Sequence, residues 1–210
     1  MTFLKYEDQP EHKMTPLFSS SPPIILASNS PRRKALLDQI GLATQVIPSQ
    51  VNEDPSFPLQ PAEYAEHYAR SKAQTVAEKY HQALVIGADT IVVLNGAILG
   101  KPPSAQAAHS MLSRLSNRTH TVITGVSLQW KENGIEDTFH EKTAVTFYPI
   151  LSEEITHYIK NWKPFDKAGS YGIQDWSSIW VKGIEGCYFN VVGFPIAAFY
   201  QHFKKIVKKA

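Results

Sequence analysis

The chain has 210 residues, of which 43% are hydrophobic and 11% aromatic, so it can bury a substantial core in one domain or two close lobes. The 21 basic and 19 acidic residues leave a formal net charge of only +2, which gives no global indication of a polynucleotide or an anionic membrane as partner. The single cysteine, Cys187, excludes an internal disulfide framework and a cysteine-rich zinc site, and no apolar run reaches the roughly 20 residues of a membrane span.

Residues 1–21 are polar and lack sustained periodicity, which predicts a flexible N-terminal extension before a single domain over residues 22–210. The chain does not begin with a basic segment followed by an apolar stretch, so we expect a cytoplasmic protein. The domain starts with the apolar run IILAS, which predicts a buried strand. Ser30 as N-cap, Pro31 at the first helical position and Gly41 as terminator predict a helix directly after it.

The middle of the chain predicts a long helix followed by central strands. Residues 62–81 have helical periodicity, and Lys72 falls on a row of otherwise largely apolar side chains. The run ALVIGADTIVVL is rich in branched residues and predicts either a central strand pair or one kinked strand. Asn95-Gly96 then predicts a hairpin turn, and Ser104 is the expected N-cap of another helix.

The second half of the chain favours antiparallel pairing. The segments THTVITGVSLQW and TAVTFYPI predict strands separated by an Asn133-Gly134 turn. Cys187 is expected on a strand as a small buried residue. A helix is predicted from residue 152, and a loop with several glycines over 164–174. Further strands are predicted over about 179–192, and an amphipathic C-terminal helix from 196.

The segment SNSPRRKALL gives the first indication of function, because Arg32 and Arg33 lie in the first turn of the predicted helix. The positive end of the helix dipole disfavours cations there, so we expect an anion to compensate. Backbone N–H groups and two guanidinium groups match phosphate oxygens, and the hydroxyls of Ser28 and Ser30 can add donors. These residues predict a polyphosphate site; the alternative is that both arginines point into water.

A second indication is Asp89, a carboxylate between two apolar stretches that would otherwise be buried whole. A buried carboxylate is costly unless it is hydrogen-bonded, paired or bound to metal. Asp89 is therefore either a structural residue satisfied by backbone amides and Thr90, or a general base or ligand of magnesium or manganese. Gly87 and Ala88 remove bulk beside it, which predicts close approach of a ligand to the backbone.

Two lysines favour a phosphate ligand. Lys72 lies on the inward row of its predicted helix, and Lys101 lies in the rigid turn LGKPP. The alternatives are that Lys72 reaches the surface along its aliphatic stem and that Lys101 is an ordinary loop lysine. Glu53, in the polar loop VNED, is by itself only a weak candidate.

The segment PFDKAGSYGIQ concentrates polar groups around two glycines, Gly169 and Gly172, which permit close ligand approach. The amide of Gln174 can both donate to and accept from the edge of a base. The alternative is a structural turn before a strand. The chain has neither a Walker loop nor a Rossmann glycine fingerprint, and its histidines lack paired metal-ligand spacing.

Three segments together resemble the signature segments of the Maf nucleotide pyrophosphatase family, in the order and spacing of that family: LASNSPRRKALLDQIG, GADTIVVLNGAILGKP and DKAGSYGIQ. The resemblance extends from about Ile24 to the C-terminal helix. It implies an α/β fold of the Maf/ITPase-like kind, with a long twisted mixed sheet flanked by helices and two lobes around a central cleft. It also implies hydrolysis of nucleoside triphosphates to monophosphate and pyrophosphate with a divalent cation, Mg²⁺ or Mn²⁺, often in a homodimer.

Residue-for-residue correspondence with the family implies roles for individual side chains. Asp89 is the implied catalytic proton acceptor, and we expect Glu53 and Asp89 to hold the metal. Arg32, Thr90 and Gln174 correspond to positions that tune substrate choice. The full set expected to bind substrate is Ser28, Arg32, Arg33, Glu53, Lys72, Thr90, Lys101 and Gln174.

Within the family, the segments SPRR, ADT and YGIQ resemble the members that act on dTTP and UTP, with nucleotide pool sanitation or cell division arrest as the implied role. Two alternatives stay open: a pyrophosphatase for modified or other nucleotides such as 7-methyl-GTP or CTP, and a non-catalytic nucleotide-binding or nucleic-acid-binding division regulator. The near-neutral charge argues against extended nucleic-acid binding. The expected partners are therefore a nucleoside triphosphate and a second copy of the chain, without membrane or nucleic acid.

Overall fold

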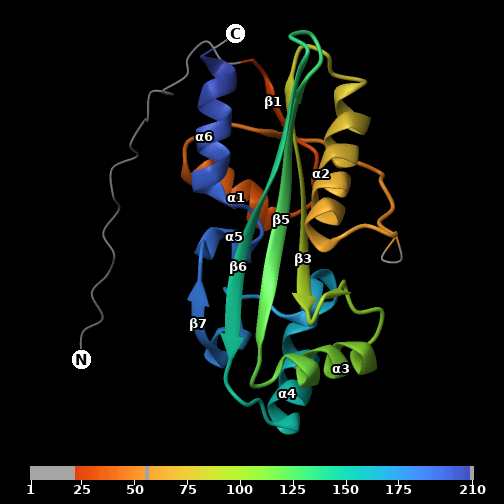
Figure 1. Cartoon of the computed structure of the whole chain (residues 1–210), viewed down its shortest axis with the longest axis vertical. Helices are drawn as coiled ribbons and strands as arrows, with labels where there is room; N and C mark the ends of the chain where they lie inside the picture. The colour runs from red at the N-terminus through yellow and green to blue at the C-terminus, as the bar shows by residue number, and fades with distance from the viewer. Residues whose placement is uncertain (1–21, 55–56, 209–210) are drawn as a thin grey trace, which may run out of the picture.

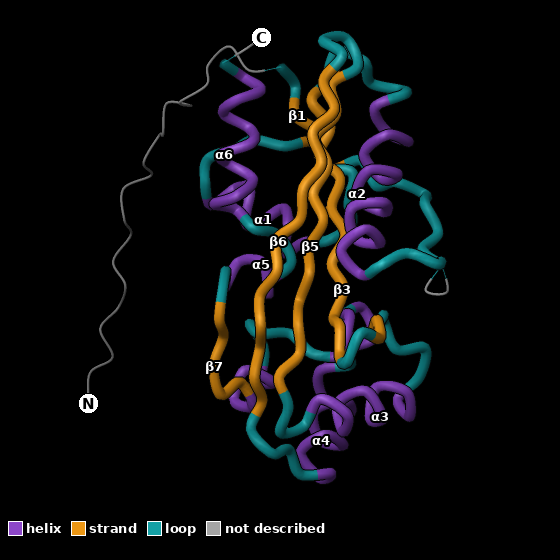
Figure 2. Tube along the Cα trace, viewed as in Figure 1, coloured by secondary structure: helices purple, strands orange, loops and turns teal. Residues whose placement is uncertain are grey.

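The computed structural model describes residues 22–54 and 57–208, and it contains one seven-stranded sheet that runs along the molecule (Figures 1 and 2). Its strands are β1 (Ile24–Leu26), β2 (Gln45–Val46), β3 (Leu84–Leu94), β4 (Ala97–Leu99), β5 (Thr119–Trp130), β6 (Ile135–Phe147) and β7 (Val181–Glu185). They follow the order β2-β1-β3-β5-β6-β7, and β4 pairs with β3. The β2-β1-β3 pairs are parallel and the others antiparallel, so the sheet is mixed. The predicted N-terminal extension lies outside the described residues.

The helices divide the sheet into two lobes. They are α1 (Pro31–Gln39), α2 (Pro61–Ala77), α3 (Ala105–Leu115), α4 (Ser152–Trp162), α5 (Tyr188–Val192) and α6 (Ile196–Val207), with short 3-10 turns η1 (Pro164–Asp166), η2 (Ala168–Ser170) and η3 (Trp176–Trp180). In Figure 1, α1, α2 and α6 lie at one end of the long strands, and α3 and α4 lie at the other. The predicted fold class, a mixed sheet flanked by helices, is confirmed.

Alternation along the strands gives each face of the sheet its own core. Leu26 and Ile86 pack with Phe199 on the face covered by α1 and α6. Their neighbours point the other way, so that Val85 packs with Val76 beneath α2. A separate core around Phe147, Leu112 and Tyr158 holds α3 and α4 at the far end of the sheet. The two lobes therefore share a continuous sheet but have their own hydrophobic cores.

Two glycines let α2 lie directly on the sheet. A Cβ atom at Gly87 would come 2.2 Å from the carbonyl oxygen of Ala69, and one at Gly125 would come 2.3 Å from that of Ala65. Such distances cannot occur, so only glycine permits this approach of helix to strand. The expectation that Gly87 leaves space for a ligand is therefore wrong: the space is filled by the backbone of α2.

The structure corrects the predicted strands at about 179–192. Only Val181–Glu185 forms a strand, preceded by η3 and followed by the short helix α5. Cys187 is neither buried nor on a strand; it is the N-cap residue of α5 and is partly exposed. The side chain of Asn190 explains the helix, because its amide donates to the carbonyl of Val122 and to Thr143 Oγ1 inside the core. This tertiary contact favours a turn of helix where the local apolar pattern favours a strand.

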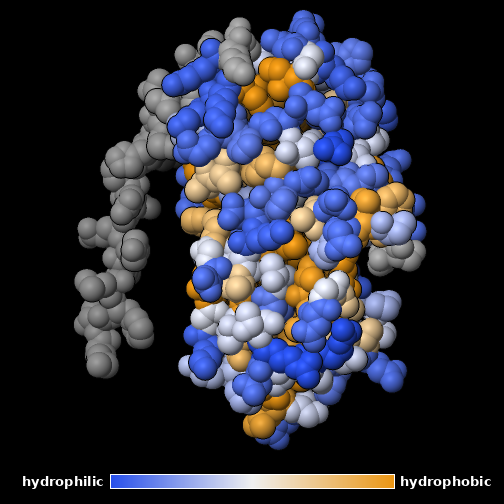
Figure 3. Space-filling view, in the orientation of Figure 1, coloured by the Kyte–Doolittle hydropathy of each residue, from blue (hydrophilic) through white to orange (hydrophobic). Residues whose placement is uncertain are grey.

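Other boundaries differ by less. The helix predicted over 62–81 ends at Ala77, the run ALVIGADTIVVL forms one strand, and the strand predicted from TAVTFYPI already begins at Ile135. The visible face in Figure 3 is mostly hydrophilic, with hydrophobic side chains in separate patches. No helix in the described part of the chain is long and apolar enough to cross a membrane.

Candidate active site

The centre of β3 lies at a gap in the sheet. Along one edge, β1 pairs with β3 only as far as Ile86, and β4 pairs only from Val92 onward. Asp89 and Thr90 lie between these limits, opposite Gly125 and Thr124 of β5 on the other edge. They lie beyond the carboxyl end of β1, the parallel neighbour of β3, where the sheet changes from parallel to antiparallel pairing. The carboxyl end of a parallel strand at such a switch point is a common place for a ligand site. The topology therefore leaves this part of β3 open to a ligand.

A cavity of about 1070 Å³ occupies this position between the two lobes. Every residue that the sequence predicted for the site lines it, although they come from separate parts of the chain. They are Ser28, Arg32, Arg33, Glu53, Lys72, Asp89, Thr90, Lys101 and Gln174. The fold thus brings the predicted residues to one volume large enough for a nucleotide-sized ligand.

Lys72 joins the two carboxylates of the site. Its ammonium lies 2.6 Å from Glu53 Oε1 and 2.7 Å from Asp89 Oδ1. Lys72 and Asp89 are only 8% and 4% exposed, so the lysine does not reach into water as the alternative interpretation required. Burial acts to raise the pKa of Glu53, but the nearby charges of Lys72, Lys101 and Arg33 hold that pKa below its usual value. Glu53 therefore stays ionised at neutral pH.

The second carboxylate oxygen of Asp89 is available to contact a ligand. Asp89 Oδ2 is buried and has no hydrogen-bond partner among residues 22–54 and 57–208. An unpaired buried carboxylate oxygen is costly, so a ligand is expected there. The same ranges hold no group of three or more His, Cys, Asp or Glu side chains placed for a metal. A divalent cation would therefore rest on Asp89 and Glu53 and take its other ligands from water and substrate, as Mg²⁺ commonly does.

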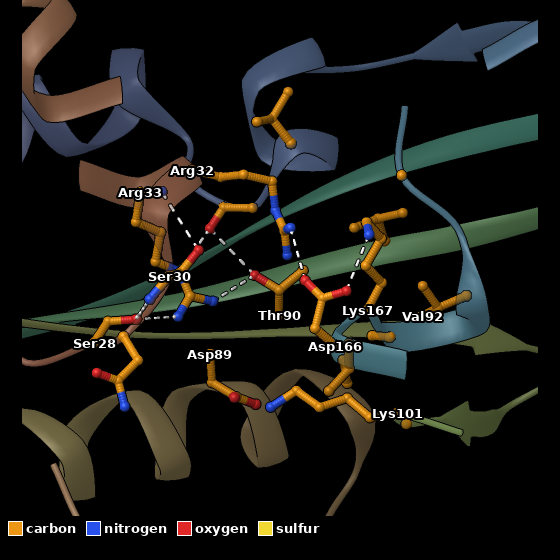
Figure 4. Close-up of a pocket in the computed structure, with 18 of the residues that line it drawn as sticks. Ser28, Ser30, Arg32, Arg33, Asp89, Thr90, Val92, Lys101, Asp166 and Lys167 are labelled. Carbon is orange, nitrogen blue, oxygen red and sulfur yellow. Dashed lines mark hydrogen bonds and ion pairs between the residues drawn. The ribbon is translucent and has the colours of Figure 1, made fainter. Parts of the chain in front are cut away.

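Arg33 is bonded to the protein rather than free for a ligand. Its Nε donates to the carbonyl of Gly193, one Nη donates to Ser28 Oγ and the carbonyl of Ala88, and the other donates to Thr90 Oγ1, at 2.9–3.0 Å. Figure 4 shows the guanidinium reaching from α1 toward Ser28 and Thr90. Burial lowers the pKa of Arg33, and the charges of Asp89 and Glu53 oppose that effect. Arg33 thus fixes the start of α1 against β3, with one N–H left over.

Thr90 is equally committed to the protein. Besides accepting from Arg33, its hydroxyl contacts Thr124 Oγ1 at 3.0 Å and donates to the carbonyl of Gly193 at 3.2 Å. Gly193 was not among the predicted residues, yet its backbone carbonyl joins both side chains. Its position is only weakly indicated in the sequence, by a glycine that follows the apolar run of α5.

Arg32 connects the two lobes across the cavity. Its Nη1 lies 3.0 Å from Asp166 Oδ2 of η1, and Figure 4 shows this contact beside Lys167. Burial acts to raise the pKa of Asp166, but hydrogen bonds from Lys167 and Arg32 hold that pKa below its usual value. Both partners are partly exposed, so a phosphate group can compete with Asp166 for the guanidinium. Asp166 and Lys167, which belong to the predicted polar segment PFDKAGSYGIQ, line the cavity too.

Of the remaining predicted residues, Lys101 and Gln174 are open to a ligand, whereas Ser28 is bonded to the protein. The exposed ammonium of Lys101 lies 3.9 Å from Glu53 Oε2. Gln174 is exposed and makes no hydrogen bond within the described ranges, so its amide is available. Ser28 accepts from Arg33 and from its own neighbour Ser30 N, which makes it part of the turn.

The segment that carries Gln174 is anchored from behind by a buried pair. Tyr171 Oη lies 2.8 Å from His120 Nε2, and both rings pack on Phe147. Burial lowers the pKa of His120 to about 4 and raises the pKa of Tyr171. His120 is therefore neutral at physiological pH and can serve as a hydrogen-bond partner without introducing a buried charge.

Comparison with known proteins shows the family to which the chain belongs. A family model described as Maf-like protein matches residues 23–206. A dTTP/UTP pyrophosphatase of Carboxydothermus hydrogenoformans is 46% identical over 182 residues, which cover 87% of this chain and 97% of that protein. A dTTP/UTP pyrophosphatase of Moorella thermoacetica is 48% identical over 173 residues, covering 82% and 89%. Among solved structures, a HAM1 protein from Coxiella burnetii gives a TM-score of 0.48 at 16% identity, covering 88% of this chain and 99% of that one.

Proposed function

The chain belongs to the Maf-like protein family, and on that premise we propose that it is a nucleoside triphosphate pyrophosphatase that converts dTTP and UTP to the monophosphate and pyrophosphate. The observation that carries the proposal is the pairing of Asp89 with Lys72 and Glu53 in a cavity that also presents Arg32 and Lys101. This arrangement provides a proton acceptor, cations for phosphate oxygens and an open end for the nucleoside. The curated relatives support the choice of dTTP and UTP.

Lys72 and Asp89 supply the proton transfer in this proposal. Lys72 holds Asp89 Oδ1, so that Oδ2 is the oxygen that accepts a proton from the attacking water. The water oxygen forms a bond to the α-phosphorus, and the bond from that phosphorus to the α/β bridging oxygen breaks. Lys101 and Arg32 offset the charge of the departing pyrophosphate.

Glu53 and Asp89 would hold a divalent cation, Mg²⁺ or Mn²⁺, in the same proposal. Asp89 Oδ2 has two lone pairs, so it can bind the ion with one and accept the proton with the other, and the ionised Glu53 is the second oxygen ligand. When bound, the ion would neutralise negative charge on the phosphate groups. Within the described part of the chain no group of three or more potential ligand side chains surrounds the ion, so the affinity for metal should depend on the triphosphate.

Gln174 is the proposed base-recognition group. Its amide can donate to and accept from the edge of a pyrimidine, and it has no competing partner in the described ranges. We also propose that the protein acts in the cytoplasm and as a homodimer, on the strength of the family resemblance. Light scattering coupled to size-exclusion chromatography tests the dimer, and a monomer mass at working concentrations contradicts it.

The test is release of pyrophosphate and monophosphate from dTTP, UTP, CTP, 7-methyl-GTP and the purine triphosphates, with Mg²⁺, with Mn²⁺ and with a chelator. We expect cleavage of dTTP and UTP, in preference to the others, that stops when the metal is removed. Preference for 7-methyl-GTP would overturn the substrate assignment. No turnover of any nucleotide, together with salt-dependent binding of DNA, would overturn the enzymatic proposal.

A further inference from the structure

Trp162 is an aromatic side chain of the cavity that the proposed function does not use. It is the last residue of α4 and lines the cavity from the lobe that also carries η1 and η2. The residue is 38% exposed, which is high for the largest apolar side chain in a protein. Its indole N–H has no hydrogen-bond partner in the described ranges. Part of the indole therefore faces the space that a ligand would occupy.

The indole is held in place by other rings. Tyr158 stacks on it with ring centroids 6.0 Å apart and 20° between the planes, and Trp176 lies 5.5 Å away at 32°. Tyr158 in turn donates to the carboxylate of Asp175, at 3.0 Å from Oδ2, and Asp175 follows Gln174 in the chain. The position of Trp162 is thus tied to the segment that carries the proposed base-recognition amide. A ring held in this way loses little conformational freedom when it binds a ligand.

The other aromatic rings of the cavity lining are covered. Tyr64 is 3% exposed and Tyr171 is 6% exposed, and the hydroxyl of Tyr171 is already bonded to His120. Among the described lining residues, Trp162 is therefore the one aromatic side chain with a substantial surface open to a ligand. The cations Lys72 and Lys101 also line the cavity but come from other elements, α2 and the loop after β4, and phosphate groups are expected beside them.

We propose that Trp162 is a substrate-binding residue that stacks on the nucleobase of the bound nucleotide. The inference rests on the proposed function and adds to it the contact that binds the face of the base, whereas Gln174 binds its edge. Stacking accepts any planar base, so Trp162 contributes affinity, and the choice among bases stays with hydrogen-bonding groups. An inorganic polyphosphate has no base, so its binding should not depend on Trp162.

The test compares Trp162→Ala and Trp162→Phe with a matched control, Phe165→Ala. Phe165 is 39% exposed, close in sequence, and absent from the cavity lining. The measurements are kcat and KM for UTP, calorimetric binding of UMP, and inhibition by inorganic tripolyphosphate, with the melting temperature of each variant. Trp162→Ala should raise KM and the Kd of UMP by about 5-fold to 100-fold, while the inhibition constant of tripolyphosphate stays within about twofold. Trp162→Phe should restore most of the affinity, and Phe165→Ala should leave it unchanged.

Two results would overturn the inference: unchanged KM and UMP affinity in Trp162→Ala, or an equal loss of affinity for UMP and tripolyphosphate. The second result would mean that Trp162 only supports the shape of the cavity. If the wild-type protein binds UMP but cleaves no nucleoside triphosphate, the proposed function fails, and the binding comparison still decides the role of Trp162. If the wild-type protein binds no nucleotide, both proposals fail.

Discussion

The ammonium of Lys72 lies 2.7 Å from Asp89 Oδ1, in a contact between two buried side chains on α2 and β3. A buried charge pair is only weakly stabilising as a whole, but loss of one partner leaves the other charge unpaired. Lys72 lies near Asp89 because α2 approaches the sheet at Gly87, two residues before the carboxylate. The local packing of helix on sheet therefore determines which oxygen of Asp89 is occupied.

Asp89→Asn should abolish most of the activity while the protein stays folded. The amide has nearly the shape of the carboxylate but cannot accept a proton from water, so turnover of UTP should fall by about 10²-fold to 10⁴-fold. Asp38→Asn is the control, because Asp38 is an exposed carboxylate of α1 paired with Lys34. Circular dichroism checks the fold. A rate for Asp89→Asn within about tenfold of wild type would remove Asp89 from the proton transfer.

Lys72→Met should destabilise the protein in a pH-dependent way. In the wild type the folded-state pKa of Glu53 lies below its unfolded value, so its stabilising contribution is complete above about pH 4.3 and is lost as the pH falls through the folded pKa. Without Lys72, Glu53 and Asp89 lose the cation between them, and the free energy of unfolding near neutral pH should drop by about 3–5 kcal/mol.

The difference in the free energy of unfolding between Lys72→Met and wild type should shrink when the pH is lowered below the pH range in which carboxylates titrate. Protonated acids carry no charge, so the cation no longer stabilises them. Urea unfolding monitored by fluorescence at neutral and acidic pH measures both quantities. An equal difference at the two pH values would show that Lys72 acts through packing of its aliphatic stem instead.

Arg33→Lys and Arg32→Lys should have different effects. Arg33 donates to Ser28, Ala88, Thr90 and Gly193, and a lysine ammonium cannot reproduce this planar set. Arg33→Lys should therefore lower the free energy of unfolding by about 1.5–3 kcal/mol, and it should also lower turnover. Arg32→Lys disturbs only a partly exposed pair, so its unfolding free energy should change by less than about 1 kcal/mol while KM rises. Denaturant unfolding and steady-state kinetics on the same preparations measure both effects. Equal destabilisation by Arg33→Lys and Arg32→Lys would contradict the prediction.

The sequence predicted which residues meet at the site, for reasons that the structure explains. Lys72 lies on the inward row of its helix, and Asp89 interrupts a buried strand, so both had to face a common interior. The sequence did not predict that Arg33 would bond to the protein. The residues at a helix start indicate that hydrogen-bond donors are present. They do not indicate whether the acceptor is a phosphate or a distant carbonyl such as that of Gly193.

The errors in the predicted fold have the same physical origin. The run that forms α5 is apolar and short, and only the buried contacts of Asn190 with β5 and β6 make it helical. The sequence does not indicate a site role for Trp162, because an aromatic residue at the end of an amphipathic helix is normally part of a core. Its exposure depends on how α4 meets the cavity, which is a tertiary property.

Gly87→Ala should weaken both the fold and the site. The added Cβ would overlap the carbonyl oxygen of Ala69, so α2 has to move away from β3. We expect a loss of about 1–3 kcal/mol in the free energy of unfolding, and a lower turnover because Lys72 moves with the helix. Gly183→Ala is the control, since a Cβ at Gly183 meets no atom within 4 Å. If Gly87→Ala has normal stability and kinetics, the close approach of α2 is not required.

His120 should make the protein acid-sensitive in a defined range of pH. Burial lowers its folded-state pKa to about 4, whereas an unfolded histidine titrates near pH 6.5. The unfolded state therefore binds the proton first, and stability is complete above about pH 6.5 and falls by up to about 1.4 kcal/mol per pH unit down to about pH 4. His120→Gln keeps a hydrogen-bonding group near Tyr171 Oη but does not titrate, so its stability should decline less across this range. Unfolding free energies measured from neutral to acidic pH test this, and parallel curves for the two proteins would show that His120 is protonated in the fold or exposed to water.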